Sequence, residues 1–259
     1  MSQNLNSRAI LAILISVSLI ACNGKDKSEE TTASTESSAA STETAVTTTS
    51  TNDMDAAKVA PNIYKVLADT MGIRMLEVNV APGDSSAMHS HPDNVVYVTN
   101  GGTMTFTTKD GSKVTAELKS GAALIRPAET HSSKNTGKTT IKGILVEVNR
   151  SGAISSPDAL DATKVASNHY KVIADTMGIR IVETNYKPGE SSVMHAHPDL
   201  ALYVVNPGKA EFTKKDGTKQ VMELTKGMTA VVPADTHSAK NIGTTAFKGI
   251  LVEVYRAIK

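Results

Sequence analysis

The chain beyond residue 60 consists largely of short hydrophobic segments with the periodicity of β-strands. Segments rich in β-branched residues, such as 95–98, 104–107 and 144–148, are separated by glycine, proline, asparagine and aspartate. Asp-Gly pairs at 110–111 and 216–217 each stand between two such segments, which is a strong hairpin signal. The best helix candidates, 66–71 and 172–177, are short and fit a strand equally well. The pattern predicts an all-β fold, either an antiparallel barrel or a jelly roll.

The pattern occurs twice along the chain. Residues 62–150 align with residues 168–256 without an insertion or deletion, and about half of the aligned positions are identical. Such a gapless repeat predicts two domains with the same fold, which we place at 56–150 and 162–259. Residues 151–161, which include Gly152 and Pro157, are the predicted linker between them.

The N-terminus has the features of an export signal. Arg8 is followed by an apolar run from Ala9 to Ile20, which is too short to span a bilayer as a helix. Leu-Ile-Ala-Cys at 19–22 resembles the lipobox of bacterial lipoproteins. The resemblance implies that residues 1–21 are a signal peptide and that Cys22 carries a lipid; the alternative is an ordinary secretory signal with an incidental cysteine.

A lipid on Cys22 would anchor the protein to a lipid bilayer of the bacterial cell envelope. Asn23 after the cysteine is compatible with delivery to the outer membrane under the sorting pattern of enteric lipoproteins, and we expect the outer membrane or the periplasmic face. Cys22 is the only cysteine, so an intramolecular disulfide is excluded. Residues 22–55 are dominated by Ser, Thr, Ala and Glu, and we predict that they form a disordered tether.

Composition excludes some partners. The net charge is +1 with well-mixed signs, so the basic stripe expected of a nucleic-acid-binding protein is missing. The chain has three Phe and no Trp, which argues against carbohydrate binding by aromatic stacking and predicts an aliphatic core.

Six of the seven histidines fall at matched places in the two repeats. In each copy a His-x-His pair is followed about 40 residues later by a third histidine, and the copies are 106 positions apart. Residues two apart on a strand point to the same face, so each trio can converge inside a narrow barrel. We expect a divalent transition metal ion (Fe, Zn, Mn, Ni or Cu) in each repeat. The predicted ligands are His89, His91 and His131, and then His195, His197 and His237.

The spacing around these histidines resembles the two cupin motifs. Gly83, His89, His91 and Gly102 match the first motif, and Gly121, Pro127, His131 and Asn135 match the second; the later copy repeats them at Gly189, His195, His197, Gly208, Gly227, Pro233, His237 and Asn241. The resemblance covers both repeats and implies a bicupin of two tandem jelly-roll barrels. Each repeat also resembles the small single-domain cupins that are associated with β-alanine degradation.

The sequence departs from the cupin pattern at the fourth metal ligand. Alignment places Val95 and Ala201 where the family has a glutamate, which leaves the ion with three imidazoles and an additional open position. Residues near the ion that could replace the carboxylate, or support the imidazoles, are Asp93, Tyr97, Asp199 and Tyr203. The two aspartates could instead shape the loop through Asx turns. Glu77, Glu147, Glu183 and Glu253 lie in apolar strands, where alternation does not resolve which face they occupy. A buried one could act as a proton acceptor, and we expect them to face solvent by default.

Two functions of different classes fit these observations. One is a metal-dependent enzyme, such as an oxygenase, that acts on a small molecule. The other is a non-catalytic module that binds a small molecule or a metal ion, or that docks to a cell-envelope partner. Val96 and Val98 are expected on the outer face of their strand, where they would pack against the other barrel or against a second copy in a homodimer.

Overall fold

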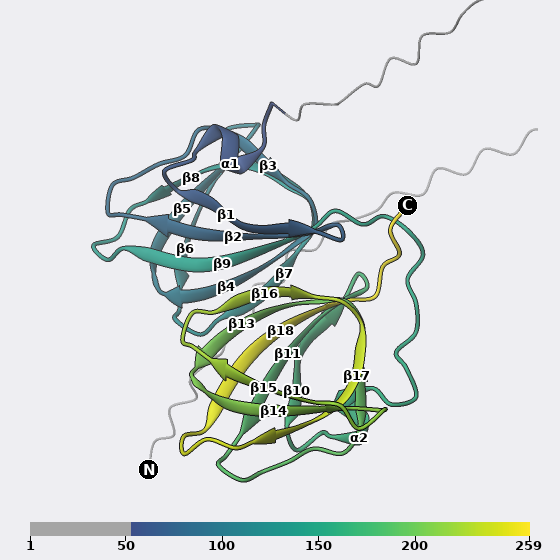
Figure 1. The fold of residues 1–259 in the computed structure, drawn as a ribbon. Coiled ribbons are helices and arrows are strands. Elements are labelled where there is room, and N and C mark those ends of the chain that lie inside the picture. The colour runs from purple at the N-terminus through teal and green to yellow at the C-terminus, as the bar shows by residue number, and fades with distance from the viewer. Residues whose placement is uncertain (1–52) are drawn as a thin grey trace, which may run out of the picture. The chain divides into compact units, whose positions relative to one another are not determined.

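The computed structural model describes residues 53–259, so the predicted signal peptide, Cys22 and most of the predicted tether lie outside the described residues. The described chain is all-β, and its two repeats form two jelly-roll barrels, as predicted (Figure 1). Barrel 1 contains the first repeat and barrel 2 the second. Within residues 53–259, no helix has both the length and the apolar character needed to cross a membrane.

Barrel 1 is built from a five-stranded and a four-stranded antiparallel sheet. The five-stranded sheet has the order β1-β2-β9-β4-β7 and the four-stranded sheet the order β3-β8-β5-β6. Their strands are β1 (Tyr64–Thr70), β2 (Ile73–Val80), β3 (His89–His91), β4 (Asn94–Asn100), β5 (Gly102–Thr108), β6 (Lys113–Leu118), β7 (Ala123–Arg126), β8 (Glu129–Asn135) and β9 (Ile141–Val148).

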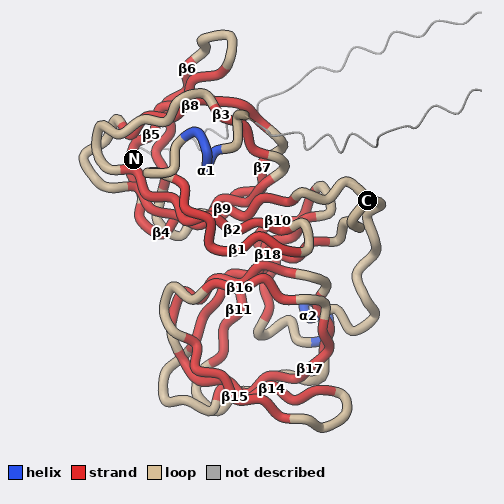
Figure 2. Tube along the Cα trace, turned by 45° about the horizontal axis from the view of Figure 1, so that its top comes forward, coloured by secondary structure: helices blue, strands red, loops and turns tan. Residues whose placement is uncertain are grey.

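Barrel 2 repeats this arrangement, with sheets β10-β11-β18-β13-β16 and β12-β17-β14-β15. Figure 2 shows its strands closing into a barrel. The strands are β10 (Tyr170–Thr176), β11 (Ile179–Tyr186), β12 (His195–His197), β13 (Leu200–Asn206), β14 (Gly208–Lys214), β15 (Lys219–Leu224), β16 (Thr229–Val232), β17 (Asp235–Asn241) and β18 (Phe247–Val254).

The ambiguous segments 66–71 and 172–177 are strands, because they pair with β2 and β11 through two-residue turns. The predicted Asp-Gly hairpins are confirmed between β5 and β6 and between β14 and β15. Gly111 and Gly217 in these turns have φ near +84° and +83°, a region that glycine enters without steric cost.

A one-turn helix precedes the first strand of each barrel. Asp55 caps α1 (Ala56–Val59) by accepting hydrogen bonds from two backbone amides, and its carboxylate also pairs with Arg74. Asp161 likewise caps α2 (Ala162–Val165) and pairs with Arg180 at 2.7 Å. Both aspartates stand at the end of a segment that we predicted as tether or linker, and both make contacts of a folded barrel.

The outer faces of the two five-stranded sheets contribute to one apolar cluster. It includes Ile73, Met75, Val95, Ile144, Val146 and Val148 of barrel 1 with Ile179, Ile181, Ala201, Ile250, Val252 and Val254 of barrel 2. All of these side chains are at most 7% exposed, so the two barrels share a core that burial of apolar surface stabilises.

The faces of β4 are the reverse of those we predicted. Val95 and Tyr97 belong to the cluster between the barrels, whereas Val96 and Val98 line the interior of barrel 1. Because side chains alternate along a strand, an error of one residue transfers every side chain to the opposite face. The outward valines that suggested a homodimer are therefore inside the barrel.

Candidate metal centre

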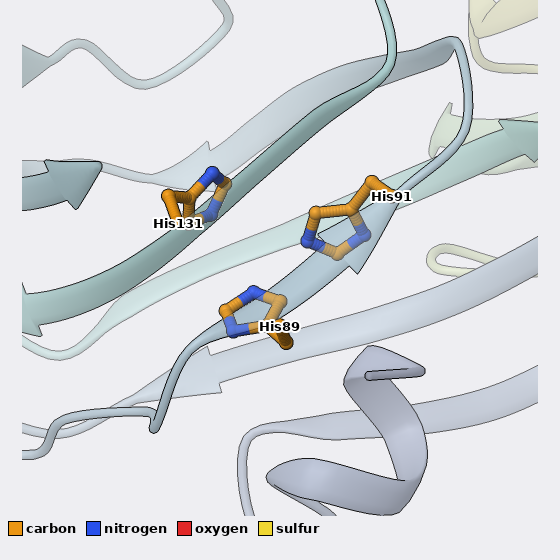
Figure 3. A group of neighbouring side chains, drawn as sticks. All are labelled: His89, His91 and His131. Carbon is orange, nitrogen blue, oxygen red and sulfur yellow. The ribbon is translucent and has the colours of Figure 1, made fainter. Parts of the chain in front are cut away.

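The three histidines of barrel 1 converge, as the spacing predicted. His89 and His91 are the two ends of β3, and the pairing of β3 with β8 sets His131 directly opposite His89. The ring centroids of His89 lie 4.8 Å from those of both His91 and His131 (Figure 3). One ligand atom from each residue falls within 4.8 Å of the others, and all three side chains are buried. This group could hold a metal ion.

Barrel 2 contains the same cluster. His195 and His197 end β12, and His237 on β17 pairs with His195 in register. The centroid separations from His195 are 5.0 Å to His197 and 4.8 Å to His237. The repeat thus preserves a second group that could hold a metal ion.

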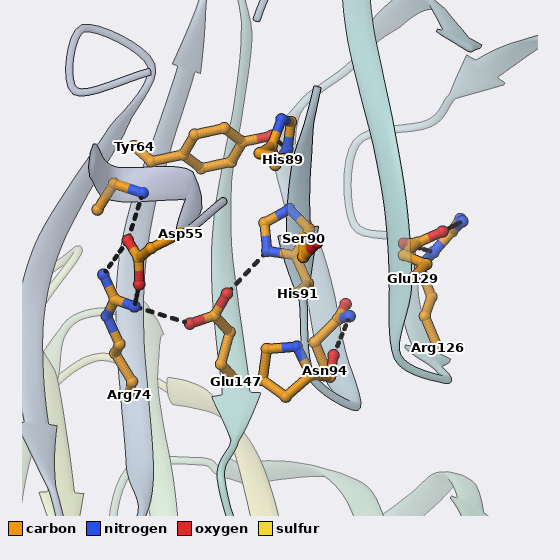
Figure 4. Close-up of polar contacts among 12 residues, drawn as sticks. Asp55, Tyr64, Arg74, His89, Ser90, His91, Asn94, Arg126, Glu129 and Glu147 are labelled. Atoms are coloured by element: carbon orange, nitrogen blue, oxygen red, sulfur yellow. Dashed lines mark hydrogen bonds and ion pairs between the residues drawn. The ribbon is translucent and has the colours of Figure 1, made fainter. Parts of the chain in front are cut away.

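A buried glutamate orients one histidine of each trio. The Nδ1 atom of His91 lies 2.7 Å from Oε1 of Glu147, which is 2% exposed (Figure 4). The other oxygen of Glu147 faces the Arg74 guanidinium at 3.4 Å, and Arg74 in turn binds Asp55. Our expectation that Glu147 faces solvent was wrong. The interior orientation leaves Nε2 of His91 for an ion, as in carboxylate–histidine–metal arrangements.

Barrel 2 repeats this arrangement and adds a second hydrogen-bond donor to the glutamate. Nδ1 of His197 lies 2.7 Å from Oε1 of Glu253, which is 1% exposed, so the solvent-facing prediction is wrong here too. The Tyr255 hydroxyl donates to Oε2 of Glu253 at 3.0 Å. Asn149 occupies the corresponding position in barrel 1. A signal for both glutamates was present: the run Lys-Gly-Ile-Leu-Val-Glu-Val is unchanged between the copies, with a carboxylate among apolar residues.

The backbone and a tyrosine fix the other histidine of β3. Nδ1 of His89 donates to the carbonyl of Ala87 at 2.8 Å, so Nε2 is the acceptor nitrogen. The Tyr64 hydroxyl donates to that Nε2 at 3.1 Å. In barrel 2, Tyr170 makes the same contact with His195 at 3.0 Å. Sequence reasoning did not identify these two tyrosines, although they occupy matched positions in the repeats.

Burial keeps the imidazoles of three of the six histidines neutral. It lowers the pKa of His89 to about 4 and that of His195 to about 3, and it lowers the pKa of His237 as well. Burial also raises the pKa of the Tyr64 hydroxyl to about 12. At neutral pH these three histidines therefore offer uncharged imidazole nitrogens, the form that binds metal ions, and the Tyr64 phenol beside His89 is protonated.

The third histidine of barrel 1 lies beside a different carboxylate. Glu129 forms a two-pronged ion pair with Arg126, with N–O distances of 2.7 and 2.5 Å. Burial alone would raise the pKa of Glu129, but interactions with His131 and Arg126 outweigh it and bring the value to about 2. Nδ1 of His131 is 3.5 Å from Glu129, without hydrogen-bond geometry, and is a buried nitrogen with no hydrogen-bond partner in the described structure.

The donor set fits a divalent transition ion. In each trio, two histidines direct Nδ1 at a backbone carbonyl or a buried glutamate, and the third directs Nδ1 toward Glu129 or Asp235. Three imidazoles, two of them with Nδ1 held by a hydrogen-bond partner, suit Fe, Zn, Mn, Ni or Cu rather than Mg or Ca, which prefer oxygen ligands.

The aspartates after each His-Pro pair have partners other than the trio. The Asp93 carboxylate accepts a hydrogen bond from the Ala128 amide at 2.7 Å and pairs with Arg256 of barrel 2. Asp199 does the same with the Ala234 amide and with Arg150. The proposal that they support the metal site is corrected: they fasten loops and join the barrels.

The tyrosines that we predicted beside the ion also lie elsewhere. The rings of Tyr97 and Tyr203 contact each other at 5.4 Å between centroids, within the cluster between the barrels. Val95 and Ala201, at the aligned position of the missing glutamate, face the same cluster. The polar side chain of β4 that lines the interior is that of Asn94, whose Oδ1 is buried without a hydrogen-bond partner among the described residues.

Each trio borders a cavity inside its barrel. His91 and His131 line a cavity of about 90 Å3 in barrel 1, together with Arg126 and Glu129. His197 and His237 line a cavity of about 240 Å3 in barrel 2, whose wall is mainly apolar. The space beside the histidines is therefore larger in barrel 2.

Comparison with known proteins agrees with this architecture. The family model described as cupin domain matches residues 182–253, which lie in barrel 2. No curated protein matches the chain in sequence.

Solved structures match across both barrels. AerE from Microcystis aeruginosa is 15% identical with a TM-score of 0.51, and the match covers 74% of this chain and 97% of that protein. A variant of oxalate decarboxylase from Bacillus subtilis is 16% identical with a TM-score of 0.53, covering 73% of this chain and 71% of that enzyme. Likeness at these identities concerns the fold. Together with the repeated barrels, it shows that both halves of the described chain have the cupin fold, and the family match identifies a cupin domain at residues 182–253.

Proposed function

We propose that each barrel binds a divalent transition metal ion through its three histidines, and that the chain is a metal-dependent enzyme, oxygenase-like or of a related type, acting on a small molecule. The observation that carries the proposal is the convergence of three buried imidazoles in both barrels, with Nδ1 of His91 and of His197 held by a buried glutamate. The solved oxalate decarboxylase from Bacillus subtilis is described as having Mn(II) centres, which makes manganese one of the candidates.

A bound ion would supply Lewis acidity or, as Fe(II), the activation of O2. The chain's own residues would do the rest. Glu147 and Glu253 hold His91 and His197 in one tautomer and orientation. The Tyr64 hydroxyl beside His89 stays protonated at neutral pH, so it can donate a hydrogen bond to an oxygen atom of a bound substrate.

Metal analysis tests this proposal. The chain from residue 23 onward, which retains every described residue, is purified without oxygen and its metal content is measured. We expect about two ions per chain, and loss of nearly all of them in the His89→Ala/His195→Ala variant. A metal-free wild-type protein after growth in metal-rich medium would refute the proposal. Turnover of small oxygenated substrates by the loaded protein then tests catalysis.

A non-catalytic binding role is the second candidate. The observation that favours it is the small cavity of barrel 1, about 90 Å3, which leaves little room for a substrate beside the histidines. Metal-loaded protein that binds small molecules but leaves them unchanged would support this alternative, as would docking to a cell-envelope partner without turnover.

We also propose that a lipid on Cys22 anchors the barrels to the bacterial envelope. The support is the sequence Leu-Ile-Ala-Cys after an apolar run, followed by a Ser/Thr-rich segment long enough to act as a tether. Expression in a bacterium with radiolabelled palmitate should label the wild type and not Cys22→Ser. Equal labelling of both proteins, or wild type found only in the soluble fraction, would contradict the anchor.

A further inference from the structure

The two barrels have the same histidines but different cavity walls. Four positions at the 106-residue offset change from polar or large in barrel 1 to apolar or small in barrel 2. The pairs are Asn94 and Leu200, Leu124 and Ala230, Arg126 and Val232, and Ser133 and Ala239. The repeat therefore kept the metal-facing side chains and altered the surface that a ligand would touch.

These changes accompany a larger chamber in barrel 2, whose wall is mainly apolar. Its cavity of about 240 Å3 is more than twice the 90 Å3 of barrel 1. An apolar cavity of about 150 Å3 is known to bind benzene, so this chamber has room for a short alkyl chain or a substituted ring. Its apolar wall includes Leu200, Leu202, Val204, Phe212, Met222 and Met228.

A lysine lies where this chamber opens. His197, Lys214 and Asp235 line both the chamber and an outer groove, so the chamber reaches the surface at these residues. Lys214 is exposed and pairs in register with His237 across β14 and β17. Barrel 1 has Thr108 at this position.

The charges around this lysine leave it able to meet an anion. The Asp235 carboxylate is directed at Nδ1 of His237 from 3.4 Å. Asp216, in the same hairpin as Lys214, accepts a hydrogen bond from the Thr218 amide at 2.8 Å. Neither carboxylate forms an ion pair with Lys214 in the described structure. A cation at the mouth of an apolar chamber suits a ligand that has one anionic end.

We propose that barrel 2 binds small amphipathic carboxylates, with the apolar body in the chamber and the carboxylate at Lys214 beside the histidines, and that barrel 1 does not. The inference names the ligand class of one of the two centres and rests on the function proposed above. The two barrels are then specialised: the same three-histidine group serves a large apolar chamber in barrel 2 and a much smaller cavity, with Arg126 and Asn94 in its wall, in barrel 1.

Calorimetric titration with octanoate tests the inference on the metal-loaded chain from residue 23 onward. We expect one octanoate per chain, weaker binding of octanol, and no binding of acetate, which lacks the apolar body. Lys214→Thr introduces the residue of barrel 1 at an exposed position and should weaken octanoate binding by about tenfold or more, without changing octanol binding. Lys240→Thr, the same change on an exposed residue that lines neither space, should leave both unchanged.

The apolar wall is tested separately. Leu200→Asn/Val232→Arg gives barrel 2 two residues that barrel 1 already accommodates, and should abolish binding of both octanoate and octanol. Octanoate binding that Lys214→Thr leaves unchanged, or a stoichiometry of two, would overturn the inference. Metal content measured on the same samples distinguishes failure of the proposed function from failure of the proposed ligand class. A wild-type protein without metal refutes the function. A wild-type protein with full metal content that does not bind octanoate refutes only the ligand class.

Discussion

Asp93 of barrel 1 and Arg256 of barrel 2 form an ion pair, with Oδ2 and Nη1 2.7 Å apart. The reciprocal pair, Arg150 of barrel 1 with Asp199 of barrel 2, has the same length. Each aspartate also accepts a hydrogen bond from the loop that precedes the strand of the third histidine. The contact between the barrels is thus continuous with the loops that precede the strands of His131 and His237.

Asp199→Asn should destabilise the fold by about 2 kcal/mol, because it leaves the 4%-exposed Arg150 guanidinium without its carboxylate. This loss of stability is smaller than for a fully buried ion pair, because Asp199 is 27% exposed. Urea unfolding measures the change. Glu223→Gln in the exposed Lys209–Glu223 pair is the matched control and should cost less than about 0.5 kcal/mol. Equal effects of the two variants would contradict the structural role of the pair.

The barrels and the histidine trios could be predicted because the repeat supplied an internal test of each pattern. Turn residues and His-x-His spacing are local features, and both copies agreed on them. The faces of β4 and β9 could not be predicted. Ile144, Val146 and Val148 pack between the barrels, while Leu145 packs inside barrel 1. Because apolar residues occupy both faces of the strand, the sequence shows no alternation of polar and apolar residues that would distinguish the two faces.

The roles of Asp93 and Tyr97 depended on the second barrel. Their partners, Arg256 and Tyr203, are more than one hundred residues away along the chain, and no local pattern shows which surface of one repeat meets the other. The same limit explains Glu147, whose orientation follows from the face of β9 that turns inward.

Glu147→Gln should lower the metal affinity of barrel 1 by roughly 10-fold to 100-fold, because a neutral amide supports the His91 imidazole less strongly than a carboxylate. Competition with a chelator measures the affinity, and the ion in barrel 2 serves as the internal reference. Glu77→Gln, the same substitution at an exposed position on neighbouring β2, should leave both affinities unchanged. An unaltered affinity in Glu147→Gln would mean that the carboxylate does not support the ion.

The effect of Tyr64→Phe should depend on metal. In the metal-free protein the substitution leaves the buried Nε2 of His89 without its donor, which costs about 1–3 kcal/mol. In the loaded protein that nitrogen would bind the ion, so the loss should be much smaller. Thermal unfolding with and without metal compares the two states. An identical loss of stability in both states would show that Nε2 of His89 does not bind the ion.

Acid should destabilise the metal-free protein in a defined interval. The pKa of His89 is about 4 and that of His195 about 3 in the folded chain, whereas both are near 6.5 when unfolded. The unfolded chain therefore binds more protons below pH 6.5, and stability is full above that pH and falls as the pH drops toward 4. Urea unfolding across this range should show a shallower decline for His89→Gln/His195→Gln. A steeper decline in that variant would refute this cause.

The hairpins between β1 and β2 and between β10 and β11 carry a backbone strain that one substitution should relieve. Met71 and Met177 have φ of 52° and 55°, a region that is costly for a long side chain, and each precedes a glycine with φ of 66°. Two successive left-handed residues match a turn that favours Asn-Gly. Met71→Asn should therefore stabilise barrel 1 by about 0.5–1 kcal/mol, since asparagine tolerates this conformation. Met75→Asn, in a strand and 0% exposed, should strongly destabilise instead. Destabilisation by Met71→Asn in urea unfolding would mean that contacts of the Met71 side chain outweigh the backbone strain.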